Sequence, residues 1–374
     1  LGLDLKVISG DDPRTVAALA RQAGFPDGIE LVSGPELAAM DDEEFDRAAA
    51  GATVFGRIIP EQKDRLVDAL MRRGLRVAMM GDGVNDVLAL KKASLGIAMQ
   101  SGSGAARDVA DMVLLDDSFG VLRPAFHEGR RIIGGMINSL YLFLTRVATS
   151  TLIIMAVTMI GLDFPFDPAQ VSLTTFSVGV PSFFLTLWAR PQRMEEDLLP
   201  SLARFVTPAA LVGMLMGAGI YVADYNVVLG SPLVSGDIPD KVKQVYESYT
   251  GVSFGSEGYR DIVATVTAQG SLSIFVSWIA CFVILFLEPP SRLFLGWRKE
   301  VSPDKRPALL AAALFVLFFV IWSVPSVGYY FGILVKPLPI TMILLGLAVV
   351  WFFLVRTIWR TNLFERVLGL DKVK

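Results

Sequence analysis

The sequence predicts two unlike parts, an α/β domain with a parallel sheet followed by an all-α bundle of six transmembrane helices. The 374 residues are 53% hydrophobic and only 19% charged, which is too apolar for an ordinary soluble enzyme. This apolarity is unevenly distributed. Short strand-like and helix-like runs alternate up to about Gly120, whereas apolar runs of about 20 residues dominate from about Asn138 onward.

The first part alternates strand-like and helix-like segments, which predicts a parallel sheet. Apolar runs that end in polar residues or glycine predict strands, and apolar residues at helical spacing predict helices. The predicted strands are 5–8, 53–59, 76–80, 95–99 and 112–115, and the predicted helices are 13–24, 61–73, 87–93 and 103–110. Functional sites in such sheets form beyond the carboxyl ends of the strands, so the loops there are expected to hold the chemistry.

One of these loops is the run Gly81-Asp82-Gly83-Val84-Asn85-Asp86, directly after a predicted strand. Asp82 and Asp86 supply the hard oxygen ligands that Mg²⁺ prefers, and the glycines let the backbone come close to a ligand. Asn85 can donate a hydrogen bond to a phosphoryl oxygen. A simple turn without a ligand is the alternative, but the complete run at a strand end favours a site for a phosphoryl group with Mg²⁺.

Two more loops follow predicted strand ends and can reach the same crevice. Lys63, at the beginning of the helix 61–73, can neutralise phosphoryl charge. In the loop Ser9-Gly10-Asp11, the Ser9 hydroxyl and the Gly10 N–H can hold another phosphoryl oxygen. The three loops together predict a site of phosphoryl transfer.

Composition excludes several other kinds of site. The formal net charge is −3 and no stretch concentrates Lys and Arg, which argues against a nucleic-acid partner. His127 is the only histidine, so catalytic triads and metal clusters built on histidine are excluded, and we interpret it as a solvated or packed residue. Cys281 lies inside an apolar run, so no disulfide framework or thiolate metal site is available.

Several of these segments resemble the P-type ATPases of the haloacid-dehalogenase superfamily, continuously up to about Leu140. Ser9-Gly10-Asp11 is similar to the family's Thr-Gly-Asp motif, with Ser9 in place of Thr. Arg57-x-x-Pro60-x-x-Lys63 is similar to its Arg-x-x-Pro-x-x-Lys motif. The other segments that carry the resemblance are 77–86, 88–93 and 96–99, which match the hinge-motif region, and 110–117, which leads to the fifth membrane helix.

The resemblance implies a haloacid-dehalogenase-like, Rossmann-type fold and a set of roles. Asp82 would bind Mg²⁺ at an aspartyl phosphate, with Asp86 at the same site. The residues implied in catalysis are Ser9, Gly10, Asp11, Lys63, Asn85 and Asp86. Mg²⁺ and ATP are the implied cofactors. The family's nucleophilic Asp, nucleotide-binding domain and first four membrane helices are absent from the chain. We therefore expect it to need a missing N-terminal half of the same polypeptide and to be inactive alone.

Six apolar spans follow, at 138–161, 169–189, 205–228, 262–287, 308–331 and 339–356. By the same resemblance, 1–125 is the C-terminal half of the phosphorylation domain, 126–137 a stalk, 138–360 the membrane domain (helices 5 to 10 of a full pump) and 361–374 a cytoplasmic tail. Basic residues gather after the second, fourth and sixth spans; they are Arg190, Arg193, Arg204, Arg292, Arg298, Lys299, Lys305, Arg306, Arg356, Arg360, Arg366, Lys372 and Lys374. This bias predicts a multi-pass protein of the cell membrane with both ends of the region cytoplasmic and 230–261 as the largest external loop.

Hydroxyls and helix-breaking residues in the first two spans predict an ion pathway. The candidates are Thr149, Ser150, Thr174, Ser177, Gly179 and Pro181. Hydroxyls on the first span either line a cavity or bond back to the preceding turn. A broken backbone in the second span frees carbonyls for a cation. Compared with the best-known calcium pumps, the chain has Val178 and Ser150 in place of acidic residues, so a divalent cation would need charge from the missing fourth helix.

The predicted function is ATP-driven transport of a cation through an aspartyl-phosphate intermediate, with Ca²⁺ as the expected ion. Six helices after the phosphorylation domain resemble the ten-helix calcium, sodium and proton branches and argue against a heavy-metal pump. The lipid bilayer and the transported cation are the expected partners, and the composition is compatible with a bacterial source. Three alternatives stay open: a pump for Mg²⁺, Mn²⁺, Na⁺, K⁺ or H⁺, a membrane-tethered phosphatase with the same Asp82 chemistry, and a secondary transporter.

Overall fold

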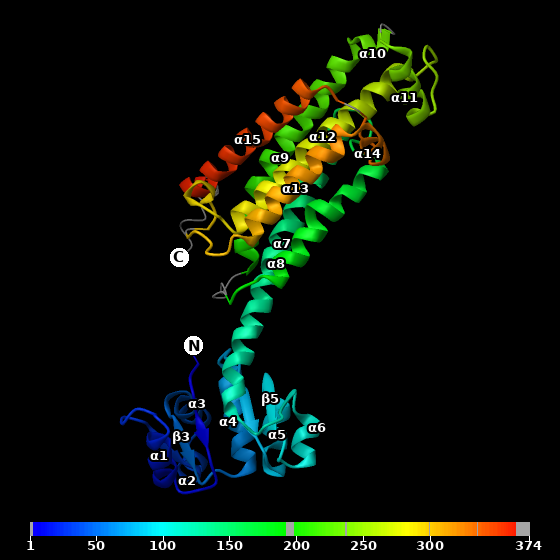
Figure 1. Ribbon diagram of the computed structural model, residues 1–374. Helices are drawn as coiled ribbons and strands as arrows, with labels where there is room; N and C mark the ends of the chain where they lie inside the picture. Colours follow the sequence, from blue (N-terminus) through cyan, green and yellow to red (C-terminus); the bar gives the residue numbers. More distant parts are fainter. Residues whose placement is uncertain (1–2, 192–197, 236–237, 299, 335, 364–374) are drawn as a thin grey trace. The chain divides into compact units, whose positions relative to one another are not determined.

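The computed structural model describes residues 3–191, 198–235, 238–298, 300–334 and 336–363. The chain divides into two compact units, Leu1–Phe126 and His127–Lys374, and each is considered by itself (Figure 1). Most of the predicted tail, 364–374, lies outside the described residues. The same holds for five of the predicted basic residues, namely Arg193, Lys299, Arg366, Lys372 and Lys374.

The first sheet of the N-terminal unit has three parallel strands in the order β1, β3, β2. The strands are β1 (Val7–Ile8), β2 (Leu31–Ser33) and β3 (Val54–Gly56), and the helices of this region are α1 (Pro13–Gln22), α2 (Gly34–Ala39), α3 (Asp42–Gly51) and α4 (Pro60–Arg72). The sequence prediction missed β2, α2 and α3. Capping boxes from Ser33 to Glu36 and from Asp41 to Glu44 begin the two missed helices, so that signal was present in the sequence.

The second sheet is also parallel, in the order β4, β5, β6. It contains β4 (Ala78–Gly81), β5 (Leu95–Met99) and β6 (Met112–Leu114), with the 3₁₀ turn η1 (Val84–Asp86) and helices α5 (Val87–Lys92) and α6 (Gly104–Val109). The predicted parallel pairing is confirmed, although the described strands form two small sheets. Helix α4 packs against both sheets, because Leu66 belongs to the hydrophobic core of the first sheet and Val67 to that of the second.

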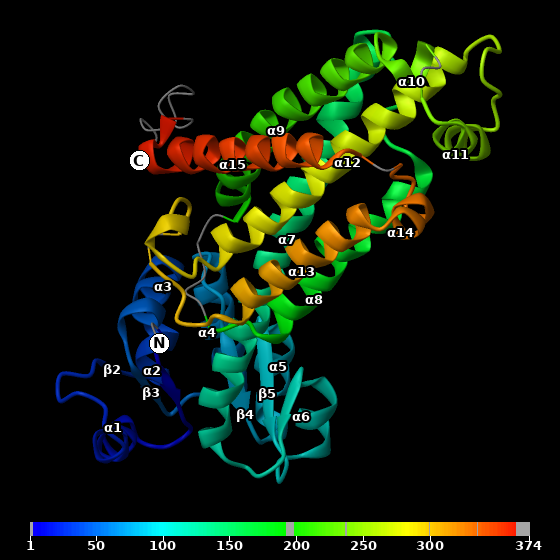
Figure 2. The ribbon, with the colours of Figure 1, turned by 45° about the horizontal axis from the view of Figure 1, so that its top comes forward.

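Among the described residues, six helical segments are long and apolar enough to cross a membrane, as predicted. They are α7 (Leu122–Met159), the segment Pro168–Leu187, α9 (Leu198–Leu229), α12 (Tyr259–Leu287), α13 (Arg306–Ser323) and α15 (Leu338–Thr361). Helix α12 is the central one, with 89% of its most apolar window buried. It contacts α9, α13 and α15, which surround it in Figures 1 and 2. A helix that is mostly apolar around its circumference is expected in such a central position.

The second span is not a regular α-helix. It begins with the 3₁₀ turn η3 (Pro168–Ser172), continues as the π-helix η4 (Thr175–Gly179) and ends as α8 (Val180–Leu187). Pro181 has no N–H to donate to the carbonyl four residues earlier, which favours a widened turn there. The π-helix therefore lies within the helix-breaking cluster that the sequence predicted.

The prediction of one continuous span over 308–331 is wrong in its last third. Helix α13 ends at Ser323, and a separate short helix, α14 (Pro325–Tyr330), follows. Pro325 explains the break, because the residue before a proline is disfavoured in helical conformation.

The predicted external loop 230–261 contains two short helices, α10 (Pro232–Ser235) and α11 (Asp240–Thr250). The other 3₁₀ turns of the described residues are η2 (Phe119–Val121) and η5 (Arg292–Phe294).

Candidate functional site

Lys63 and Asp86 meet in the N-terminal unit. Lys63 Nζ lies 2.6 Å from Asp86 Oδ1, and the two side chains are 15% and 8% exposed. The second carboxylate oxygen, Asp86 Oδ2, accepts a hydrogen bond from the Gly83 N–H at 3.3 Å. Lys63 comes from the first turn of α4 and Asp86 from η1, so packing of α4 on the loop after β4 brings the pair together. Partial burial reduces the screening of this ion pair by salt.

The loop after β4 folds tightly around the Asp86 side chain. A Cβ atom added at Gly81 would lie 2.5 Å from Asp86 Cβ, so the loop has no space for a larger residue. The Asp82 carbonyl oxygen accepts a hydrogen bond from the Ser103 N–H at 2.7 Å, which fixes the backbone. The residues Asp82 and Asn85 themselves are exposed. The loop thus buries Asp86 and presents Asp82 and Asn85 to solvent.

The third predicted loop lies at the end of β1. Ser9 Oγ accepts a hydrogen bond from the Asp11 N–H and lies 3.2 Å from Asp11 Oδ2, so its hydroxyl is engaged within the loop. Arg57 N–H donates to the Asp11 carbonyl at 2.7 Å, which ties the loop to the turn that opens α4. Gly10 has open space beside it. Among the described residues no hydrogen bond links this loop to Lys63 or to residues 81–86, so only part of the predicted site is assembled.

The donor set at this site fits Mg²⁺ that arrives with a phosphoryl group. Asp82 is exposed, whereas Asp86 is already paired with Lys63. In the described part of the chain, no three His, Cys, Asp or Glu side chains gather as a metal cluster. Mg²⁺ commonly takes one or two carboxylates and completes its shell with phosphate and water oxygens, so a larger cluster is not required.

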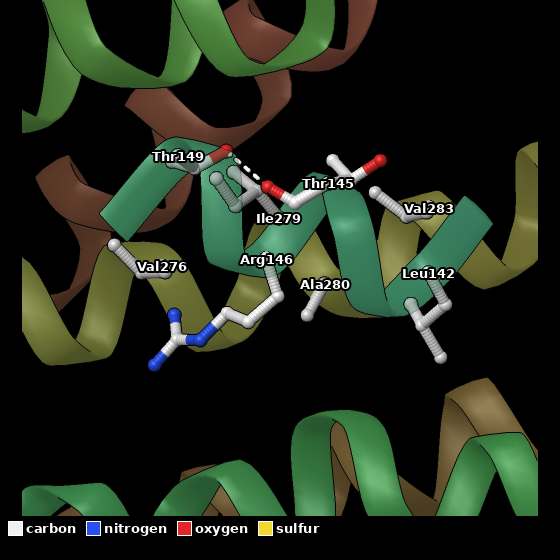
Figure 3. A pocket seen from close by; sticks show the side chains of 8 residues that line it. All are labelled: Leu142, Thr145, Arg146, Thr149, Val276, Ile279, Ala280 and Val283. Carbon is white, nitrogen blue, oxygen red and sulfur yellow. Dashed lines mark hydrogen bonds between the residues drawn. The ribbon is translucent and has the colours of Figure 1, made fainter. Parts of the chain in front are cut away.

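Two threonine hydroxyls of α7 bond back to their own helix. Thr145 Oγ1 donates to the Tyr141 carbonyl and Thr149 Oγ1 to the Thr145 carbonyl, each at 2.7 Å. Back-bonding, one of the two possibilities that the sequence raised, holds for both threonines. Both also line a pocket between α7 and α12 (Figure 3). Arg146 lines the same pocket, and its Nη1 atom is buried with no hydrogen-bond partner among the residues that the structure describes.

The second span contributes one buried hydroxyl without a partner. Ser177, in the π-helix, is 1% exposed, and its Oγ has no hydrogen-bond partner within the described ranges. Thr174 immediately precedes the π-helix, Gly179 ends it and Pro181 follows in α8. No hydrogen bond between described residues joins Ser177 to the α7 hydroxyls.

A polar stripe on α12 was missed by the sequence analysis. Thr265, Gln269, Ser273 and Ser277 recur every four residues and are all buried. Ser273 Oγ donates to the side-chain oxygen of Gln170 in η3 at 2.5 Å. Residues four apart lie on one face of a helix, so the spacing alone could have indicated a polar face on an otherwise apolar span.

Several known proteins are similar to this chain. Residues 1–94 match the haloacid dehalogenase-like hydrolase family. "Calcium-transporting ATPase CtpE" of Mycolicibacterium smegmatis is 31% identical over 385 aligned residues, which cover 99% of this chain and 42% of that protein. "Probable cation-transporting ATPase exp7" of Streptococcus pneumoniae is 36% identical over 56% of this chain and 28% of its own length. "Calcium-transporting ATPase 1" of Yarrowia lipolytica is 33% identical over 59% of this chain and 25% of its own length.

Among solved structures, the catalytic domain of the CPx-ATPase CopB-B aligns with 32% of this chain and 38% of that chain, at 27% sequence identity and a TM-score of 0.25. The chain spans less than half the length of the curated relatives named above. The match to the haloacid dehalogenase-like hydrolase family lies within the N-terminal unit, and the six candidate membrane spans of the described residues follow it. The chain is similar to part of these cation-transporting ATPases, in agreement with its P-type ATPase motifs, and its six candidate spans indicate a multi-pass membrane protein.

Proposed function

We propose that this chain belongs to a pump that hydrolyses ATP through an aspartyl phosphate and moves a cation across a cell membrane. The observation that carries the proposal is the buried Lys63–Asp86 pair beside the exposed Asp82, on the same chain as six candidate membrane spans. The relatives named as cation-transporting ATPases support it. The basic residues after the second, fourth and sixth spans support a cytoplasmic position for the N-terminal unit and the C-terminus.

In the proposed reaction, ATP is the phosphoryl donor and the accepting carboxylate lies outside these 374 residues. Asp82 would hold Mg²⁺, which would supply positive charge to the phosphoryl oxygens. Asp86 holds the Lys63 ammonium at the edge of the same loop, where it can offset phosphoryl charge. Asn85 is exposed and can donate to a phosphoryl oxygen. The Ser9 to Asp11 loop would join the site when the bound phosphoryl group draws the loops together.

The proposed ion pathway runs along the polar atoms of α7, the second span and α12. It includes the predicted Thr149, Ser150, Thr174, Ser177, Gly179 and Pro181, and we add the α12 stripe Thr265, Gln269, Ser273 and Ser277. The unpartnered Ser177 hydroxyl and the widened backbone of η4 support it, because both offer oxygen atoms inside an apolar bundle. Ca²⁺ is the proposed ion, since side-chain amide and backbone carbonyl oxygens are among its usual ligands and two of the relatives above are named calcium-transporting.

The test uses the complete gene product that contains this chain. Phosphoenzyme formed from radiolabelled ATP is measured with Mg²⁺ present, and ATPase activity is then measured with Ca²⁺, Mn²⁺, Na⁺ and K⁺ added in turn and with Mg²⁺ varied. We expect Asp82→Asn to abolish the phosphoenzyme and Ca²⁺ to stimulate the wild-type activity. An unchanged phosphoenzyme level in Asp82→Asn would refute the Mg²⁺ role, and a lack of Ca²⁺ stimulation would refute the ion. Hydrolysis of phosphate esters that no cation stimulates would favour the tethered phosphatase instead.

A further inference from the structure

An ammonium group is held by oxygen atoms in the helical unit, near the point where α9 ends and α12 and α15 begin. Lys336 Nζ donates to Asp224 Oδ2 at 2.8 Å and to the Thr267 carbonyl oxygen at 2.7 Å. Ser271 Oγ donates to the same Asp224 Oδ2 at 2.6 Å. The Lys336 and Asp224 side chains are 5% and 14% exposed. Helices α9 and α12 and the segment just before α15 therefore meet at one enclosed charge pair.

The local sequence explains how Lys336 reaches this position. Lys336 precedes Pro337 and the beginning of α15, so its backbone lies at a helix entrance. Its side chain passes over Gly270 of α12, where an added Cβ would lie 3.3 Å from Lys336 Cε. A larger residue at position 270 would crowd the stem of the lysine. Because Gly270 has no side chain, the Lys336 side chain can lie across α12 and place its ammonium inside the bundle.

Asp224 is an unusual carboxylate in this unit. The other acidic residues within the described candidate spans are Glu128 and Asp261, and Asp261 lies in the first turn of its helix. An ionisable residue inside a membrane span is by default a candidate ligand for a transported ion. Here the charge of Asp224 is already balanced by Lys336, and its Oδ2 atom accepts two hydrogen bonds. Breaking such a buried pair leaves an uncompensated charge, and this cost favours the state in which the ammonium remains bound to Asp224.

We propose that these oxygen atoms form a cation site whose resident occupant is the tethered Lys336 ammonium. The ligand class that this site accepts is a primary ammonium. A carboxylate and a backbone carbonyl both accept hydrogen bonds from an N–H donor, which matches an ammonium with three protons. Through its hydrogen bonds to Asp224 and Thr267, Lys336 connects the beginning of α15 to α9 and α12. Asp224 then serves this internal site and is not a ligand of the transported cation.

Chemical rescue tests the proposal on the complete gene product in detergent. Lys336→Ala should lower the midpoint of thermal unfolding by several degrees, and added propylammonium should restore it in a saturable way. Tetramethylammonium at the same ionic strength should not restore it, because it has the charge but no N–H donor. Lys241→Ala, at an exposed position on α11, is the matched control and should show neither loss nor rescue.

Two results would overturn the proposal: equal rescue by both salts, or a Lys336→Ala protein as stable as the wild type. If Lys336→Ala fails to fold, Lys336→Met keeps the apolar stem and is compared with the double variant Lys336→Met, Asp224→Asn. The double variant should be the more stable of the two, because it removes the unpaired carboxylate. A double variant no better than Lys336→Met would contradict the pairing. The readout requires no ATPase activity, so it is independent of the proposed pump.

Discussion

Lys63 Nζ lies 2.6 Å from Asp86 Oδ1 and joins α4 to the loop after β4. Among the ion pairs of the described N-terminal residues, it is the one in which both partners are largely buried; in the others at least one side chain is far more exposed. The pair therefore ties α4 to the loop that also contains Asp82, and in the proposed function it supplies the positive charge of that site.

The first prediction concerns removal of the ammonium. Lys63→Met should destabilise the protein by about 3 kcal/mol, because the Asp86 carboxylate is left buried and unpaired. Phosphoenzyme formation should be lost as well. Denaturant unfolding and labelling with radioactive ATP measure the two effects. Adding Asp86→Asn to Lys63→Met should recover part of the stability without recovering the phosphoenzyme, since the two residues contact each other and their effects are not additive. Strict additivity would contradict a coupled pair.

The second prediction concerns the space beside Asp86. Gly81→Ala should cost about 1–3 kcal/mol of stability and displace Asp86, because the new methyl group would overlap its side chain. Gly104→Ala is the control, since a Cβ at Gly104 meets no atom within 4 Å. Unfolding and phosphoenzyme level are compared for the two variants. Equal behaviour of both would show that the close approach at Gly81 has no structural role.

The third prediction separates function from stability at Ser177. The hydroxyl is buried without a described partner, so Ser177→Ala should leave the unfolding midpoint unchanged or raise it. If the hydroxyl contacts the transported cation, the same change should weaken the apparent cation affinity about tenfold, which corresponds to about 1.4 kcal/mol. Cation-dependent ATPase activity gives this affinity. Ser172→Ala, at an exposed position in η3, should alter neither quantity. A drop in stability without a change in affinity would assign Ser177 to packing.

The fourth prediction is a pH dependence at Asp304, just before α13. The Arg306 guanidinium holds the pKa of the Asp304 carboxyl below its usual value, and hydrogen bonding by the Arg306 N–H and the charge of Arg190 act in the same direction. A lowered pKa means that the stabilisation is complete above about pH 4 and is lost as the pH falls through the lowered pKa.

Asp304→Asn should therefore lower stability at neutral pH by about 1 kcal/mol, a modest value because the two arginines are about half exposed. Its deficit should shrink as the solution is acidified. Unfolding midpoints measured against pH for wild type and variant test this. Asp240→Asn, which changes an exposed carboxylate on α11, should give no such convergence. A constant deficit at all pH values would exclude the charge of Asp304 as the cause.

Sequence reasoning was most reliable where the signal is local. The run Gly81 to Asp86 at a strand end and the long apolar spans depend on neighbours along the chain, and both appear as predicted. It was least reliable between residues 25 and 52, where β2, α2 and α3 are short and mostly polar. It also missed the break at Pro325, because the apolar composition continues through it.

The sequence by itself determined the class of the protein, because motif spacing and span length are properties of contiguous residues. Only the tertiary structure decided which charges neutralise one another. Lys63 and Asp86 are 23 positions apart, and Asp224 and Lys336 are 112 apart. No local pattern specifies such pairs, since helix packing alone brings the two members within hydrogen-bonding distance. Within its own unit, Asp82 is exposed and open to a ligand, whereas Asp224, in the other unit, is paired with the Lys336 ammonium.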